Sequence, residues 1–458
     1  MGVTEEVARF TSELTWEVLP PKVVEIAQDH ISDAWGVTLA GSGQDSAQIL
    51  RQVLEVGGTG AVPVVGTDRR ASALVAALLN GTAGHALDYD DTQLSTSPEA
   101  VYGLLTHPSV PVLSAASALA CERPTTGRAL VVAYVAGVEV ACRVADAMDS
   151  RHYQDGFHST GTAGAIGAAA AAAKILGLGP DVTATALGIA ASQSAGLREN
   201  FGTMTKPLHA GRAAQSGVLA ALLAEAGFTA SRAILEAPRG FLNAAAGGFD
   251  STKLAGCLGS PFFLETPGVS IKPYPSGSLS HPAQDLILSI VARENLAPEQ
   301  IERVEVGTNS NVLNALIHHR PTTGLEGKFS LEYCMATGVV RRRAGLSDFT
   351  DEAVQDPELQ AFLPKVDVVV DQDLEALGFQ HVRSRVTVNC TDGRIFQGTA
   401  DWARGYPQKP LTAEELEEKF VDCAGVVFPP DRARGLWHTV SRVGTAELVG
   451  TVMEELAS

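Results

Sequence analysis

The densest group of chemically capable side chains lies between His85 and His107. It directly follows an Ala-rich apolar segment that predicts a buried helix. Because an unpaired charge is costly to bury, groups of this kind are solvated, paired with one another or part of a site. The stretch therefore predicts a functional site where a buried helix ends. Its polar members are His85, Asp88, Asp90, Asp91, Thr92 and His107.

Three further clusters combine cations, hydroxyls and glycines near the expected starts of helices. They cover residues 156–161, 200–212 and 272–281, and contain His158, Lys206, His209, Ser278 and His281. Taken singly, each has a structural interpretation as a helix cap, a solvated turn or a hinge. Free N–H groups at a helix start favour anions. Together the clusters therefore indicate a site for a carboxylate-bearing substrate.

The residue types favour acid–base chemistry. Histidine titrates near neutrality and can both remove and return a proton, while lysine can hold a carboxylate or stabilise developing enolate charge. A serine hydrolase would need G-x-S-x-G after a strand, which is absent. The aspartate spacing would also suit a divalent cation, but no second set of ligands accompanies it. We expect no metal and no other cofactor.

Composition excludes several classes of protein. A net charge of −18 argues against nucleic acid as a partner, since phosphates are bound by Lys and Arg. The six cysteines are scattered without a CxxC pair, which argues against a zinc ribbon or an iron–sulfur cluster. No signal peptide and no uncharged apolar run of about 18 residues is present. We expect a cytoplasmic protein that has no membrane partner.

The elements that position these clusters are predicted to be mainly helical. The expected helices cover residues 4–19, 23–40, 46–56, 71–86, 110–120, 128–148, 161–176, 180–195, 210–226, 282–294 and 446–456. Strands are expected over 301–306, 366–370 and 382–390, with a hairpin turn at Asp392-Gly393. The glycines between 161 and 167 lack the strand and spacing of a nucleotide-binding fingerprint, so we interpret them as helix-packing residues.

A chain of 458 residues predicts two domains. The predicted fold is mainly α: a large all-helical domain plus a smaller α+β lid domain inserted before the C-terminal helices. The predicted boundaries give 1–266 as the first part of the helical domain, 267–403 as the lid, and 404–458 as helices that return to the helical domain. Thr412 and Glu415 have the spacing of a capping box at the start of those helices.

Read in order, these motifs resemble the MmgE/PrpD family, which includes 2-methylcitrate dehydratase, cis-aconitate decarboxylase and iminodisuccinate epimerase. The matching segments are residues 80–81, 85–92, 106–109, 156–158, 205–209 and 328–333. The resemblance covers essentially the whole chain and is specific to the family, not to one activity. It implies a homodimer with an active site between a helical domain and a lid, and it implies neither a metal nor an iron–sulfur cluster.

The resemblance also implies the site residues. The catalytic set is His107, His158, Lys206, Tyr333 and Asp88, and the substrate-binding set is Thr92, Lys206 and His281. Ser278, from the cluster at residues 272–281, is added to the substrate-binding set. In the expected mechanism, either His107 or His158 abstracts a proton α to a carboxylate. The other, or the tyrosine, protonates the departing hydroxyl. Lys206 holds a carboxylate, Asp88 orients a histidine, and Asp90 and Asp91 are structural.

Two departures from the decarboxylase branch bear on the substrate. Residues 93–105 resemble an insertion, and Gly277 stands where that branch carries an additional histidine. We therefore expect a cofactor-independent lyase that dehydrates a hydroxy di- or tricarboxylate, in the manner of 2-methylcitrate dehydratase. The alternatives are an epimerase, isomerase or decarboxylase acting on a related dicarboxylate. An alternative of another class is a non-catalytic protein that binds a small acid.

Overall fold

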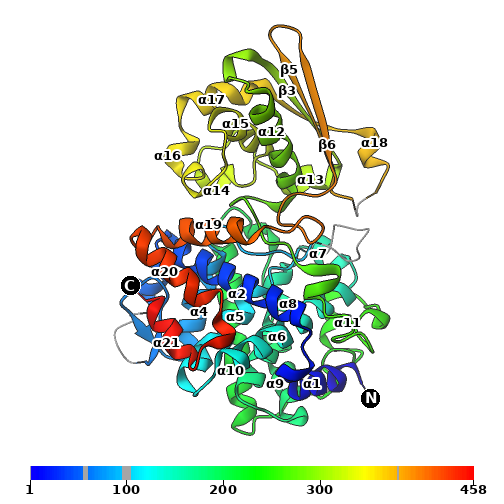
Figure 1. Cartoon of the computed structure of the whole chain (residues 1–458). Coiled ribbons are helices and arrows are strands. Elements are labelled where there is room, and N and C mark those ends of the chain that lie inside the picture. The colour runs from blue at the N-terminus through cyan, green and yellow to red at the C-terminus, as the bar shows by residue number, and fades with distance from the viewer. Residues whose placement is uncertain (1, 55–59, 95–104, 379–380, 458) are drawn as a thin grey trace. The chain divides into compact units, whose positions relative to one another are not determined.

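The computed structural model describes residues 2–54, 60–94, 105–378 and 381–457. These residues form two compact units (Figure 1). The first unit contains the described residues up to Val269 together with those from Thr412 onward, and the second contains Ser270–Leu411. The predicted mainly α fold is confirmed.

The first unit is built from helices with small, apolar faces. They are α1 Val3–Glu13, α2 Pro21–Gly41, α3 Asp45–Val53, α4 Ala73–His85, α5 Ser109–Glu122, α6 Gly127–Ala147, α7 Arg151–Gln154, α8 Ser159–Ile175, α9 Pro180–Gln193, α10 Thr205–Glu225, α11 Phe241–Ala246, α19 Ala413–Ala424, α20 Pro430–Val440 and α21 Val449–Glu455. Helix α8 is buried along residues 159–173. Because most of its residues are Ala or Gly, neighbouring helices can approach it closely.

Glycine determines how closely α4 and α10 pack. A Cβ on Gly81 would lie 2.8 Å from the Cα of Gly211, and a Cβ on Gly211 would lie 2.3 Å from the carbonyl oxygen of Leu78. Neither position can accept a larger residue without moving a backbone. The contact lies about one turn from His85, which ends α4, and from Lys206, which lies in the first turn of α10. Close helix packing therefore places both residues at the edge of the core.

Several predicted boundaries differ from the structure. Helix α10 begins at Thr205 rather than at residue 210, so the predicted turn before it is helical. The first helix ends at Glu13 and is followed by a separate 3₁₀ turn, Trp16–Val18. The first unit is not all-helical, because β1 Val62–Pro63 pairs with β2 Arg70–Ala71. Residues 55–56 of the third predicted helix lie outside the described residues.

The second unit contains a four-stranded mixed sheet with helices. The strands are β3 Ile301–Thr308, β4 Val366–Val370, β5 Ser384–Cys390 and β6 Ile395–Ala400, in the order β4-β3-β5-β6. Strand β4 is parallel to β3, and the other pairs are antiparallel. The helices are α12 His281–Glu294, α13 Ser310–Ala315, α14 Gly324–Gly327, α15 Leu331–Val340, α16 Asp351–Val354, α17 Pro357–Phe362 and α18 Gln372–Glu375. The hairpin predicted at Asp392-Gly393 joins β5 to β6, and Gly393 has a φ of +85°.

The unit boundaries fall after Val269 and Leu411 rather than after residues 266 and 403. Residues 404–411 belong to the second unit because they form hydrogen bonds with other residues of that unit. The backbone N–H of Ile271 donates to Gly405 at 2.9 Å, and the Tyr406 hydroxyl donates to the carbonyl of Ser278 at 3.0 Å. The predicted capping box, in which Thr412 and Glu415 cap each other's backbone, starts α19.

None of the described helices combines the length and the apolar character that crossing a bilayer requires.

Candidate active site

The loop that follows α4 carries three aspartates, and each has a different partner. Asp88 has a left-handed backbone with a φ of +52°, a conformation that is uncommon for a residue with a side chain. His85 Nδ1 donates to Asp90 at 2.9 Å, and His30 Nδ1 donates to Asp91 at 2.8 Å. The predicted structural role of Asp91 agrees with these contacts, which tie it to α2.

Asp91 is also fixed from α5. The backbone N–H of Ser109 donates to Asp91 Oδ1 at 3.2 Å, its hydroxyl donates to Oδ2, and the Tyr134 hydroxyl donates to the Ser109 hydroxyl at 2.5 Å. The four residues His30, Asp91, Ser109 and Tyr134 are buried. The loop is therefore held on both sides by a buried polar network.

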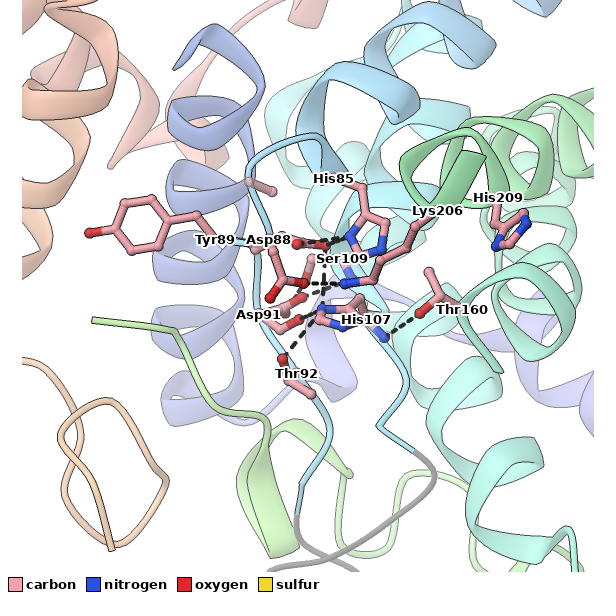
Figure 2. A network of polar contacts seen from close by, with 12 residues as sticks. His85, Asp88, Tyr89, Asp91, Thr92, His107, Ser109, Thr160, Lys206 and His209 are labelled. Carbon is pink, nitrogen blue, oxygen red and sulfur yellow. Dashed lines mark hydrogen bonds and ion pairs between the residues drawn. The ribbon is translucent and has the colours of Figure 1, made fainter. Parts of the chain in front are cut away.

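Lys206 and Asp88 form a buried ion pair (Figure 2). Each residue is 5% exposed. The Lys206 ammonium also lies 5.1 Å from the centroid of the Phe201 ring. Asp88 thus pairs with the lysine, and Asp90 bonds to His85; that Asp88 also orients a histidine remains a prediction.

His107 precedes α5 and is fixed by the same loop. Its Nδ1 donates to the carbonyl of Asp91 at 2.7 Å and lies 3.3 Å from Thr92 Oγ1. Its backbone N–H donates to the hydroxyl of Thr160, in the first turn of α8, at 3.0 Å (Figure 2). This places Thr92, predicted to bind substrate, beside the imidazole of His107.

The predicted insertion begins beside this histidine. The backbone N–H of Gln93 donates to the carbonyl of Thr106 at 2.7 Å, so the two ends of the segment are joined. Residues 95–104 lie outside the described residues. The prediction that this segment bears on the choice of substrate is therefore not tested.

His158 is the N-cap residue of α8 and is 1% exposed. Its Nδ1 lies 3.0 Å from Nδ1 of His209, while its Nε2 is buried and has no hydrogen-bond partner in the described part of the chain. The ring stacks on His85 at a centroid distance of 5.6 Å, and Phe201 contacts it edge-on at 5.0 Å. Packing therefore fixes the direction in which the unpartnered nitrogen points.

Burial lowers the pKa of both members of this histidine pair. The pKa of His158 is lowered well below its ordinary value, first by burial and then by the positive charges of His85 and Lys206. The same causes, again with burial first, lower the pKa of His209 to about 4. Both imidazoles are therefore neutral at neutral pH, and neutral imidazole can accept a proton.

The cluster also has the composition of a metal site. The ligand atoms of His85, His107 and His158 lie within 4.8 Å of one another. The ammonium of Lys206 is close enough to lower the pKa of His158, and the same charge would repel a cation. The donor set alone would suit zinc, but the adjacent lysine favours acid–base chemistry with an anionic substrate.

Three predicted site residues lie in the second unit and have partners there. The Tyr333 hydroxyl donates to the carbonyl of Asp348 at 2.6 Å, and burial raises its pKa. Ser278 begins a 3₁₀ turn, and His281 begins α12 with its Nε2 3.2 Å from the carbonyl of Ser276. Their catalytic or binding roles remain predictions.

Some residues of this site were not among those predicted to act in it. His85 and His209 lie within the polar clusters described in the sequence analysis. Their closeness in sequence to Asp88 and Lys206 was the signal that could have identified them as site residues. Lys419 carried no such signal. It comes from α19, donates to the carbonyl of Tyr89 at 3.0 Å and pairs with Asp33 at 2.5 Å. Contacts between residues hundreds of positions apart are not readable from local spacing.

A helical unit that buries several histidines, a lysine and carboxylates in one cluster has the features of an enzyme that transfers protons. Residues 5–253 match the MmgE/PrpD N-terminal domain, and residues 274–443 match the MmgE/PrpD C-terminal domain. The chain belongs to the MmgE/PrpD family and is a lyase. The resemblance noted from its motifs is thereby confirmed.

Curated relatives align over nearly the whole chain. Cis-aconitate decarboxylase from Homo sapiens is 28% identical, covering 97% of this chain and 92% of the relative. Cis-aconitate decarboxylase from Mus musculus is 27% identical, covering 97% and 91%. Cis-aconitate decarboxylase from Aspergillus terreus is 28% identical, covering 94% and 91%. This level of similarity supports the family without specifying the reaction.

Proposed function

We propose that this lyase dehydrates a hydroxy di- or tricarboxylate by abstracting the proton α to a carboxylate, in the manner of 2-methylcitrate dehydratase. The observation that carries the proposal is the state of His158. Its Nε2 is buried without a partner in the described part of the chain, and its pKa is lowered. A buried nitrogen without a hydrogen-bond partner costs free energy, so its presence calls for a functional explanation. A neutral imidazole is suited to remove an α-proton.

The substrate carboxylates would bind on the positive side of the cluster. Lys206 lies in the first turn of α10, and His158 caps α8. Helix N-termini attract anions through their N–H groups and dipole. Asp88 would hold the Lys206 ammonium in place without removing its charge. A polycarboxylate fits such a site better than a neutral or cationic substrate.

The reaction needs a base and an acid. His158 Nε2 would take the α-proton, and the electrons of the C–H bond would form the new double bond as hydroxide departs. His107 would protonate that hydroxide, giving water. The Asp90 carboxylate lies 3.6 Å from His107 Nδ1 and provides a countercharge for the imidazolium. Lys206 would stabilise negative charge that develops on the substrate carboxylate.

Decarboxylation of an aconitate-type acid is the second candidate, favoured by the names of the curated relatives. Decarboxylation would require an acid that donates a proton to the carbon from which carbon dioxide leaves, rather than a base that removes an α-proton. Gly277, where the resemblance places a histidine in the decarboxylase branch, argues against it. A Cβ on Gly277 would lie 2.9 Å from Cδ2 of Leu316, so a histidine would require that side chain to move.

NMR of the purified protein with citrate-, aconitate- and aspartate-like acids in D₂O tests the proposal. Loss of water from a hydroxy acid is the expected result. Release of carbon dioxide would establish the decarboxylase instead. Deuterium exchange without loss of a group would indicate an epimerase. Saturable binding without exchange or turnover would indicate a binding protein.

Variants test the assigned residues once a substrate is known. His158→Asn and Lys206→Met should each lower kcat/KM by about 10²-fold or more, the usual contribution of an acid–base group. His438→Asn, a matched change at an exposed position of α20, serves as the control. Full turnover by both site variants would show that the assignment is wrong.

A further inference from the structure

The contact between His158 and His209 is the feature of the site that the proposed mechanism leaves unused. The two Nδ1 atoms are 3.0 Å apart. Two nitrogen lone pairs repel at that distance, so one Nδ1 must carry a proton and donate it to the other. A histidine pair that shares one proton can move it in either direction.

The two members of the pair differ in access to solvent. His158 is 1% exposed and His209 is 9% exposed. Lys206 and His209 are three positions apart on α10, so they lie on the same side of the helix. Figure 2 shows Lys206 directed to Asp88, with His209 farther along the helix. The pair therefore runs from the enclosed end of the site toward its margin.

The surrounding backbone leaves room for the contact. The backbone N–H of His158 donates to the carbonyl of Gly196 at 3.0 Å. A Cβ on Gly196 would lie 3.3 Å from Nδ1 of His209 and 3.5 Å from Cβ of His158. A Cβ on Gly161 would lie 3.3 Å from Cβ of His209. Because Gly196 and Gly161 carry no side chains, the imidazole rings of His158 and His209 can approach each other.

We propose that His209 is a positioning and proton-relay residue that exchanges the proton of His158 with solvent. The proposal rests on the proposed function, because it requires His158 to act on the substrate. The relay would serve a dehydratase or a decarboxylase, since both need His158 to exchange protons with water.

The relay moves one proton across each of the two rings. The α C–H bond breaks, and its proton forms a bond to His158 Nε2. The proton on His158 Nδ1 moves to His209 Nδ1, and His209 Nε2 releases its proton to water. To reset the pair, His209 Nε2 takes a proton from water, and the Nδ1 proton of His209 returns to His158 Nδ1. His158 Nε2 then passes its proton to His107, which has protonated the hydroxide, so each ring is neutral or singly protonated throughout.

The charges around the pair support this path. His85, Lys206 and His107 face His158 and disfavour a second positive charge there, while Asp88 and Asp90 partly compensate them. Arg198 also lies nearby, 5.8 Å from the centroid of the Phe201 ring that contacts His158. A proton taken by His158 is therefore driven toward His209, the more exposed ring.

The test compares His209→Asn with His209→Ala and with the surface control His438→Asn. Asparagine can keep a hydrogen bond to His158 but cannot relay a proton. The readouts are kcat and the solvent deuterium isotope effect on kcat, using a tricarboxylate that the wild-type enzyme converts. We expect kcat to fall about 10-fold or more in both site variants, and the isotope effect to change because the proton step between the two rings is lost. Added imidazole should partly restore the alanine variant.

The outcomes separate the two proposals. Restoration of wild-type values by His209→Asn, or full activity in both variants, would overturn the relay and leave the proposed function intact. Absence of water loss by the wild-type enzyme with every acid in the panel would overturn both. If the variants fail to fold, ¹⁵N NMR of histidine-labelled wild-type protein decides the question at pH 6. The relay requires one protonated and one unprotonated Nδ1, and two protonated Nδ1 atoms would contradict it.

Discussion

The buried charges of the site are stable because each is matched by a partner from another part of the first unit. Lys206 pairs with Asp88, and Asp90 accepts from His85. An isolated charge in this environment would cost several kcal/mol. Nε2 of His85 and Nε2 of His158 remain without partners in the described part of the chain. These nitrogen atoms mark the position where we expect the reacting part of the substrate.

The lowered pKa of His158 predicts the pH dependence of the reaction. A base must be unprotonated to act, and a lowered pKa keeps it unprotonated to lower pH. The acid limb of kcat/KM should therefore lie below the ordinary histidine value of about 6.5. A pH–rate profile of the free enzyme measures this limb. A limb at or above pH 6.5 would contradict the assignment of His158 as base.

At the scale of elements, α10 and α19 position the site from segments that lie far apart in the sequence. The first two turns of α10 contain both Lys206 and His209. Helix α19 contributes Lys419, whose ammonium lies 4.0 Å from the centroid of the Tyr89 ring and donates to the Tyr89 carbonyl. Residues after the second unit thus fix the loop that carries Asp88.

Lys419→Met should destabilise the first unit. It would leave Asp33, which is 5% exposed, as a buried carboxylate without its cation. Removal of one partner of a buried pair typically costs about 3–5 kcal/mol, and urea unfolding measures the change. Lys22→Met is the matched control, because its pair with Glu25 is exposed and should contribute at most about 1 kcal/mol. Equal small effects in the two variants would show that the buried pair does not anchor the loop.

At the scale of the whole molecule, the prediction of metal independence can be tested directly. The described part of the chain brings three histidines together, but the Lys206 ammonium opposes a cation beside them. Activity should survive dialysis against EDTA, and metal analysis should find far less than one ion per chain. Loss of activity that zinc restores would instead assign the three imidazoles as ligands.

Much of the architecture could be predicted because it depends on local patterns. The Ala-rich helices, the Asp392-Gly393 hairpin and the capping box at Thr412 follow from side-chain spacing and backbone preference. The start of α10 could not be placed this way. From the sequence alone, Pro207 suggests that helical structure is interrupted there. A proline is tolerated in the first turn of a helix, however, and α10 begins at Thr205.

The sequence by itself determined the family, the mainly α fold and the segments that carry the chemistry. His107, His158 and Lys206 were recognisable because they lie in local segments that match motifs of the family. Only the tertiary structure decided which partners they have. Asp88 pairs with Lys206, Asp90 with His85, and His158 with His209. The physical reason is that proton transfer and charge pairing depend on distances of about 3 Å, and helix packing sets these distances between residues that lie far apart in the chain.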